Sequence, residues 1–300
     1  MMVKTNFEVI VGTYQKYLVG ISLGKDKSKE SFNFVQSFAE EAHIGGIKCV
    51  AASGNYVVSG GTDEFIRVFD MNSRRDAASL LQQEGTINCL KFIDDSHLIS
   101  GSEDSTLCVW TTSNWKCIKT LKGHKGAVNG VSIHPKGSLA LSVGKDQKII
   151  TWDLVKGRNA FVTNIKEIAN NIIWSPSEKH FIVLFDQRID FYDVNVAAPV
   201  QKVTFAKDVN CASFLNDSIL LVGLENGCLE MVDVSHNKSL KNQKIHDSRI
   251  KDICVTNKGI LTASSDGIVK LIRKANFGDR GSTNLDCRIT CMTIFNPESD

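Results

Sequence analysis

The sequence predicts an all-β fold in which one structural unit returns about every 40 residues. Three observations support this prediction. Short runs rich in β-branched and aromatic residues alternate with turns that contain Gly, Pro, Asn or Asp. No stretch of eleven residues keeps the apolar spacing of an amphipathic helix. An Asp or Asn also returns at a nearly constant interval along most of the chain.

The repeat is anchored on six positions that are 40 to 42 residues apart: Asp63, Asp104, Asp146, Asp186, Asn226 and Asp266. Four residues before them stand Ser59, Ser100, Ser142, Ile182, Val222 and Thr262. Six residues after them stand Phe69, Trp110, Trp152, Tyr192, Val232 and Ile272. Upstream, one equivalent place is occupied by His43, Gln83, His124, Ile165, Phe205 and His246. So steady a period indicates a repeat architecture.

Each unit contains four short strand-like runs, and the third unit shows them most clearly. Its runs are residues 128–133, 139–143, 149–152 and 160–164. Turn residues separate them, at 135–137, 144–146 and 156–157. We therefore expect four antiparallel strands in each unit. Both faces of so small a sheet must be covered by neighbours, and a ring of sheets achieves this for every unit.

Four-stranded units of this period, with Gly123-His124 ahead of one unit and Trp152-Asp153 inside it, resemble the WD repeats of β-propellers. The expected fold is an all-β, seven-bladed WD-repeat β-propeller that forms a single domain over residues 1–300. Its blades are expected at approximately 43–82, 83–123, 124–164, 165–205, 206–245, 246–284, and 285–300 together with 1–38.

The seventh blade is expected to be shared between the two ends of the chain. Residues 288–295 match Thr86–Ile93 in pattern and so predict an innermost strand. The N-terminus supplies the three other runs, at residues 7–11, 17–23 and 32–38. The charged segment Gly24–Ser31 is expected to be an inserted loop, and Lys274–Asp286 an irregular connection. Closure by the two ends would hold the ring shut without a covalent bond.

Composition argues against several classes of function. The net charge of +2 gives no global field that would mark a nucleic-acid or membrane binder. No apolar run reaches the roughly 18–20 residues of a membrane span, and no signal peptide is expected at the start. The nine Cys lack paired spacing, which favours buried thiols in a reducing compartment. Neither a metal site nor a cofactor is predicted, because His pairs with metal-ligand spacing and Gly-rich phosphate loops are missing from the sequence.

His124, Ser142, Asp146 and Trp152 include the residue types of an acyl-transfer site. The WD-repeat resemblance implies a structural network instead, in which the His bridges the Asp and the Ser, and the Ser meets the indole N–H. Partial copies recur in other units as His43, Ser59 and Asp63, as Ser100, Asp104 and Trp110, and as His246, Thr262 and Asp266. A catalytic site would not recur in this way. We therefore predict no catalytic residues and no enzymatic activity.

Two basic groups are candidates for binding partners. The first group is Lys116, Lys119, Lys122 and Lys125, with Lys145 nearby. Lysines on an outer strand either protect a sheet edge from pairing with another chain or contact RNA phosphates. The second group is Lys241, Lys244, Arg249 and Lys251. Of these, Arg249 and Lys251 flank a loop leading into an inner strand, where propellers commonly bind partners.

Four segments carry a more specific resemblance, at residues 11–23, 85–126, 124–161 and 249–271. They resemble a WD-repeat family of p21-activated kinase-interacting proteins that is implicated in large ribosomal subunit assembly. The resemblance extends over nearly the whole chain and is strongest over residues 85–165.

This resemblance implies a nuclear and nucleolar scaffold that joins pre-ribosomal proteins and pre-rRNA as a monomer within larger complexes. It also implies the alternative of negative regulation of p21-activated kinase by binding its regulatory region. No membrane partner is expected. Members often continue into a lysine-rich C-terminal tail, and the 300 residues do not contain one.

Overall fold

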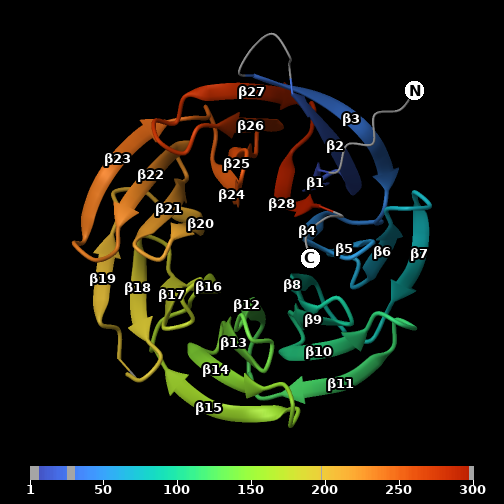
Figure 1. Ribbon diagram of the computed structural model, residues 1–300. Coiled ribbons are helices and arrows are strands. Elements are labelled where there is room, and N and C mark those ends of the chain that lie inside the picture. Colours follow the sequence, from blue (N-terminus) through green and yellow to red (C-terminus); the bar gives the residue numbers. More distant parts are fainter. Residues whose placement is uncertain (1–6, 26–30, 197, 297–300) are drawn as a thin grey trace.

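In the computed structural model, which describes residues 7–25, 31–196 and 198–296, seven four-stranded sheets are arranged as a ring (Figure 1). The described residues form 28 antiparallel strands and no helix. The predicted all-β, seven-bladed propeller is therefore confirmed. The two ends of the described chain lie side by side in one blade, here called the shared blade, and the other six are numbered in chain order.

The shared blade contains β1 (Glu8–Thr13), β2 (Tyr17–Lys25), β3 (Phe32–Glu41) and β28 (Ile289–Phe295). Blade 1 contains β4 (Ile47–Ser53), β5 (Tyr56–Gly61), β6 (Ile66–Asp70) and β7 (Arg75–Leu80). Blade 2 contains β8 (Ile87–Asp94), β9 (His97–Ser102), β10 (Thr106–Thr111) and β11 (Cys117–Lys122). Blade 3 contains β12 (Val128–Ile133), β13 (Leu139–Gly144), β14 (Lys148–Asp153) and β15 (Arg158–Asn164).

Blade 4 contains β16 (Asn171–Trp174), β17 (His180–Leu184), β18 (Arg188–Asp193) and β19 (Gln201–Thr204). Blade 5 contains β20 (Val209–Asn216), β21 (Ile219–Leu224), β22 (Cys228–Asp233) and β23 (Lys238–Lys244). Blade 6 contains β24 (Ile250–Thr256), β25 (Gly259–Ser264), β26 (Ile268–Ile272) and β27 (Asp279–Asn284). In blades 1 to 6 the first strand lies nearest the ring axis and the fourth lies at the rim (Figure 1).

The ring closes in the shared blade, where the C-terminal strand β28 supplies the innermost position and pairs antiparallel with β1. Their register places Glu8 opposite Phe295 and Val11 opposite Met292. Ile289, Met292 and Phe295 are buried, so release of β28 would expose apolar side chains as well as a row of backbone hydrogen-bonding groups. The predicted closure by the two ends of the chain is confirmed.

The predictions of two loops were wrong in part. The segment expected to be an irregular connection contains β27, because Asp279–Asn284 pairs with β26 as the outermost strand of blade 6. The outermost strands are largely solvent-exposed, so they need no β-branched or aromatic pattern, and DRGSTN gave no strand signal. The expected loop Gly24–Ser31 begins later than predicted because β2 continues through Lys25, and residues 26–30 lie outside the described residues.

The hydrophobic core lies between neighbouring blades as much as within them. In one cluster, Leu107 and Ile99 of blade 2 pack with Val128, Ala140 and Trp152 of blade 3. Trp152 is 1% exposed. Full burial of a large apolar side chain contributes about 1.5–3 kcal/mol to stability. Because each blade is buried by the next, the blades stabilise one another in sequence around the ring.

The innermost strands share one irregularity that positions the candidate site. In six of the seven blades, pairing of the innermost strand is interrupted by a β-bulge at its second residue. The bulged residues are Lys48, Asn88, Asn129, Asn210, Lys251 and Thr290. A bulge redirects the side chain of its extra residue. One polar side chain is therefore redirected at an equivalent point in each of these blades.

Candidate functional site

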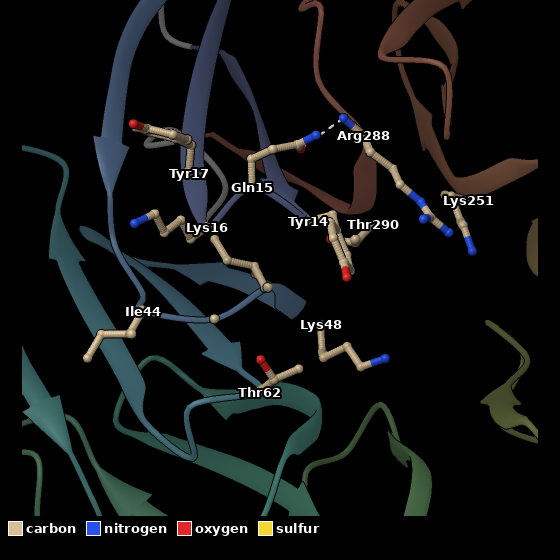
Figure 2. A pocket seen from close by; sticks show the side chains of 13 residues that line it. Tyr14, Gln15, Lys16, Tyr17, Ile44, Lys48, Thr62, Lys251, Arg288 and Thr290 are labelled. Atoms are coloured by element: carbon tan, nitrogen blue, oxygen red, sulfur yellow. Dashed lines mark hydrogen bonds between the residues drawn. The ribbon is translucent and has the colours of Figure 1, made fainter.

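The candidate site is a cavity of about 850 Å³ where the shared blade meets blades 1 and 6 (Figure 2). Two segments form much of it: residues 14–17, which are the β1–β2 turn and the first residue of β2, and residues 44–48, which lead into β4 and include its first two residues. Thr62, Lys251, Arg288 and Thr290 complete the lining. The volume lies within the range of about 300–1,000 Å³ that is usual for ligand pockets.

Cationic side chains from three consecutive blades enter this cavity. Lys48 and Lys251 occupy bulged positions on β4 and β24, and Arg288 directly precedes β28. Figure 2 shows all three side chains on the same side of Tyr14, whereas Lys16, Tyr17 and Ile44 lie on the other. The described residues that line the cavity include no Asp or Glu. Within the described part of the chain, none of the three cations forms an ion pair within 4.0 Å.

The β1–β2 turn is fixed against the start of β28. The Tyr14 N–H donates to the Arg288 carbonyl at 2.8 Å, and the Arg288 N–H donates to Oε1 of Gln15 at 3.0 Å. The Arg288 guanidinium lies over the Tyr14 ring, 5.2 Å from its centroid. Gly46 packs against the turn, and a Cβ there would make a tight contact of 3.2 Å with the Tyr14 carbonyl oxygen. The turn therefore presents Tyr14 in a defined position with its side chain largely exposed.

The cavity carries an excess of positive charge. Burial lowers the pKa of Lys251, and the nearby cations Arg249, Arg288 and Lys48 lower it further. Glu225 opposes this effect, but its carboxylate is 3.4 Å from Nε of Arg249 and accepts a hydrogen bond from the Asn210 amide at 3.1 Å. Like charges held together without a carboxylate among them attract an anion.

The polar quartet of blade 3 is fully assembled. Nδ1 of His124 is 2.8 Å from Oδ1 of Asp146, and Nε2 is 2.7 Å from Oγ of Ser142. The Trp152 indole N–H donates to the same Ser142 oxygen at 2.8 Å. All but Asp146 are buried as whole residues, and the side chain of Asp146 is 6% exposed. Burial lowers the pKa of His124, although Asp146 raises it. The quartet joins β13 and β14 to the turn between them and to the segment that precedes β12.

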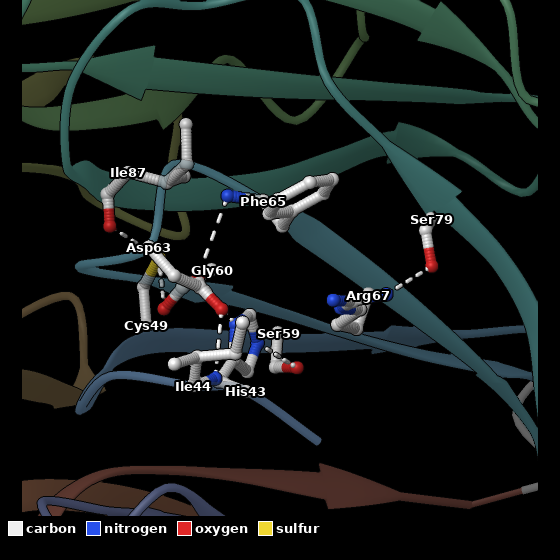
Figure 3. A network of polar contacts seen from close by, with 10 residues as sticks. All are labelled: His43, Ile44, Cys49, Ser59, Gly60, Asp63, Phe65, Arg67, Ser79 and Ile87. Carbon is white, nitrogen blue, oxygen red and sulfur yellow. Dashed lines mark hydrogen bonds and ion pairs between the residues drawn. The ribbon is translucent and has the colours of Figure 1, made fainter.

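Blade 1 repeats this arrangement without the indole (Figure 3). His43 is 2.8 Å from both Oδ1 of Asp63 and Oγ of Ser59, and Oδ2 of Asp63 accepts the Ile44 N–H at 3.0 Å. Burial pulls the pKa of Asp63 upward, but hydrogen bonds from Ile44 and His43 hold it below its ordinary value.

In blade 2, Gln83 takes the place of the His. The Ser100 hydroxyl donates to Oε1 of Gln83, and the Trp110 indole N–H donates to Ser100 at 2.9 Å. The Gln83 amide donates to Oγ1 of Thr106 at 3.1 Å, and that hydroxyl donates to Asp104 at 2.7 Å. A glutamine and a threonine together thus make the connection that a single histidine makes in blade 3.

Blade 6 differs from what the repeat predicts. Nε2 of His246 is 2.8 Å from Oγ1 of Thr262, but Nδ1 of His246 and Oδ2 of Asp266 are both buried without a hydrogen-bond partner among the described residues. The expected His246–Asp266 contact is therefore not formed. Lys270 distinguishes this blade further, because its ammonium donates to the Ile245 carbonyl at 2.7 Å and its charge, added to burial, lowers the pKa of His246.

The lysines of the first basic group lie along the outer edge of blade 2. Lys119 and Lys122 lie on β11, Lys116 precedes it, and Lys125 follows it. Lys145 is 3.4 Å from Oε1 of Glu103 in an exposed ion pair. Of the second group, Lys251 enters the cavity and Arg249 pairs with Glu225.

Sequence reasoning identified Lys251 but missed Tyr14, Lys48 and Arg288. A signal for Lys48 exists in the repeat itself. Ile47-Lys48-Cys49 and Ile289-Thr290-Cys291 align with Ile87-Asn88-Cys89, and Lys48 stands where Lys251 stands in its own unit. Tyr14 and Arg288 carry no such signal, because they meet only when the two ends of the chain close the ring.

Two protein-family models match parts of the chain. The WD domain, G-beta repeat model matches residues 32–70, 77–111 and 115–153, and a model of eukaryotic translation initiation factor eIF2A matches residues 141–271. Each matched WD repeat joins the outermost strand of one blade to the three inner strands of the next. No described helix has the length and apolar character needed to cross a membrane.

Several curated proteins are similar over almost the whole chain. A p21-activated protein kinase-interacting protein 1-like protein of Danio rerio is 34% identical, covering 97% of this chain and 81% of the relative. One from Gallus gallus is 37% identical, covering 96% and 80%. Protein MAK11 of Saccharomyces cerevisiae is 28% identical, covering 97% and 83%. Shk1 kinase-binding protein 15 of Schizosaccharomyces pombe is 29% identical, covering 97% and 85%.

Proposed function

The chain belongs to the family of p21-activated protein kinase-interacting protein 1, and from this premise we propose that it is a non-enzymatic scaffold in large ribosomal subunit assembly. The ring would dock pre-ribosomal proteins and pre-rRNA, as the family resemblance implies. The observation that carries the proposal is the acid-free cavity into which Lys48, Lys251 and Arg288 project. A site of this charge binds anionic groups and offers no nucleophile with an adjacent base.

The polar quartets support a scaffold role over a catalytic one. His124 and Ser142 have the contacts of a base and a nucleophile, but they are buried within blade 3. The cysteines of the inner strands are also unsuited to chemistry, because burial raises the pKa of the Cys89 and Cys291 thiols to about 12. Reactive cysteines need the thiolate, and a raised pKa suppresses it.

Sedimentation of cell extracts tests the proposal. The tagged protein is expected in fractions that contain large-subunit precursors, and fluorescence microscopy is expected to place it in the nucleus and nucleolus. Lys48→Glu/Lys251→Glu should shift the protein toward free fractions. Lys116→Glu/Lys122→Glu, which makes the same change of charge on the outer edge of blade 2, should not. Recovery of the wild-type protein only from free fractions would contradict the proposal.

A second candidate function is negative regulation of p21-activated kinase by binding its regulatory region. The names of the Danio rerio and Schizosaccharomyces pombe relatives favour it, because both describe kinase binding. Titration calorimetry with a purified regulatory segment of the kinase, paired with an assay of kinase activation, tests it. No measurable heat at high micromolar concentration would remove this candidate. The two functions are compatible, since a ring has several surfaces.

A further inference from the structure

The cavity combines positive charge with exposed aromatic and apolar side chains. Tyr14 is 62% exposed even though Arg288 lies over its ring. At the opposite rim, Ile44 is 80% exposed and Tyr17 is 40% exposed. Large side chains of this kind are usually buried in a core, and their exposure around a cavity marks a binding surface. Positive charge and exposed rings are the two features that single-stranded nucleic acid requires.

The arrangement fits nucleotides better than an acidic protein segment. Carboxylates need only cations, and Lys48, Lys251 and Arg288 would suffice for them. A nucleotide also needs a flat apolar surface next to the cations, and the largely exposed Tyr14 ring provides one on the face that Arg288 does not cover. Gly45 and Gly46 also line the cavity and add no side chain to it. A duplex is disfavoured, because its bases are stacked inside and cannot reach a ring that lines a cavity.

The binding groups are held in place before any ligand arrives. Lys48 and Lys251 start from β-bulges on the innermost strands, and Tyr14 is held by its backbone hydrogen bond to Arg288. At other bulges the redirected residue is an Asn whose amide is occupied: Asn88 donates to the Val128 carbonyl at 3.0 Å, and Asn129 to the Ala169 carbonyl at 2.8 Å. The lysines replace these links between blades with side chains free to bind an anion.

We infer that this cavity binds a short segment of single-stranded RNA, with one base stacked on Tyr14 and the adjacent phosphates held by Lys48, Lys251 and Arg288. The inference rests on the proposed scaffold function and names the ligand of that site. Protein docking elsewhere on the ring does not depend on it. Each lysine neutralises one phosphate, so binding weakens as salt concentration rises.

Fluorescence anisotropy of the purified chain with a labelled twelve-nucleotide uridine RNA tests the inference. Lys48→Ala/Lys251→Ala is expected to weaken binding about tenfold or more at low salt. It should also make the slope of log affinity against log salt shallower by about 1.4, from about 0.7 for each lost phosphate contact. Lys116→Ala/Lys122→Ala removes the same charge from the edge of blade 2 and should change affinity less than about twofold. Melting curves show whether each variant is folded.

Stacking is tested by two further variants. Tyr14→Ala should weaken RNA binding about tenfold, whereas Tyr14→Phe, which keeps the ring, should bind like wild type. A twelve-residue polyglutamate peptide should compete poorly with the RNA. Equal competition by that peptide, or full affinity in Tyr14→Ala, would overturn the inference in favour of an acidic protein segment. A greater loss of RNA affinity in Lys116→Ala/Lys122→Ala than in Lys48→Ala/Lys251→Ala would show that the RNA binds at the outer strand of blade 2 instead. Either result leaves sedimentation with ribosomal precursors as a separate test of the scaffold function.

Discussion

Blades 3 and 6 contain similar polar residues at corresponding positions and use them differently. In blade 3, His124 contacts both Asp146 and Ser142, and Trp152 completes the quartet. In blade 6, His246 contacts Thr262 only, and Nδ1 has no partner among the described residues. One blade therefore has a fully satisfied buried network, and the other keeps a buried imidazole with an unmade bond. Unsatisfied buried polar groups cost about 1–3 kcal/mol each.

The difference shows that the repeat motif determines where these polar residues lie in a blade more strictly than it determines which hydrogen bonds they form. The two blades share their strand pairing, including the bulge on the innermost strand. Ile272 replaces the Trp, and Lys270 lies near the imidazole, where blade 3 has Ile150 at the corresponding position. Small changes around a common backbone thus decide whether the histidine strengthens its blade or makes it sensitive to pH. Three experiments test this comparison.

The largest effect is expected from removing the acidic member of the complete quartet. Asp146→Ala leaves Nδ1 of His124 and the Lys125 N–H without their acceptor, which should cost about 2–3 kcal/mol. The matched control is Asp186→Ala in blade 4, where the carboxylate accepts a single hydrogen bond from the described residues, from the exposed Asn170 amide. That change should cost less than about 0.5 kcal/mol. Calorimetry measures both, and equal melting shifts would contradict a structural role for the quartet.

A smaller effect is expected from acidification. Burial, helped by Lys270, lowers the pKa of His246 to about 4, whereas an unfolded His titrates near its ordinary value of 6.5. The unfolded chain therefore binds a proton that the folded chain does not, and the stability present above pH 6.5 is lost as pH falls toward 4. The loss between about pH 7 and pH 5 should be about 2 kcal/mol.

His246→Gln tests the origin of this loss, because Gln83 already occupies the corresponding place in blade 2. Denaturant unfolding at several pH values should show a flatter dependence in this variant than in the wild-type chain. The variant retains the other titrating groups, including His43 and His124. The difference between the two pH dependences therefore reports the contribution of His246. Parallel curves for the two proteins would show that His246 contributes nothing to acid sensitivity.

The smallest effect is expected from Lys270→Met. Removing the ammonium relieves its repulsion of a charged imidazole, so the pKa of His246 should move back toward its ordinary value. The loss of stability between about pH 7 and pH 5 should then shrink by roughly 0.5 kcal/mol. Stability at neutral pH should fall slightly, because the Ile245 carbonyl loses its donor. Titration of His246 by NMR measures the shift, and an unchanged or lower pKa would exclude the role assigned to Lys270.

The sequence by itself determined the ring. Its 40- to 42-residue period, its turn residues and the missing innermost strand at the N-terminus predicted seven blades and their closure by the two chain ends. These features are readable because neighbouring strands in a blade pair locally, so their residues keep fixed spacings along the chain. His124, Ser142, Asp146 and Trp152 met as expected for the same reason, since all lie within or directly before one blade.

The tertiary structure decided everything that lies between blades. Lys48, Lys251 and Arg288 converge although more than 200 residues separate Lys48 from the other two, because ring closure brings blades 1 and 6 to either side of the shared blade. The tertiary structure also decided two features within blade 6. These are the polar outer strand β27 and the missing hydrogen bond between His246 and Asp266. Sequence periodicity reports which face of a strand is buried, whereas the direction of a bulged side chain depends on the twist and packing of the completed ring.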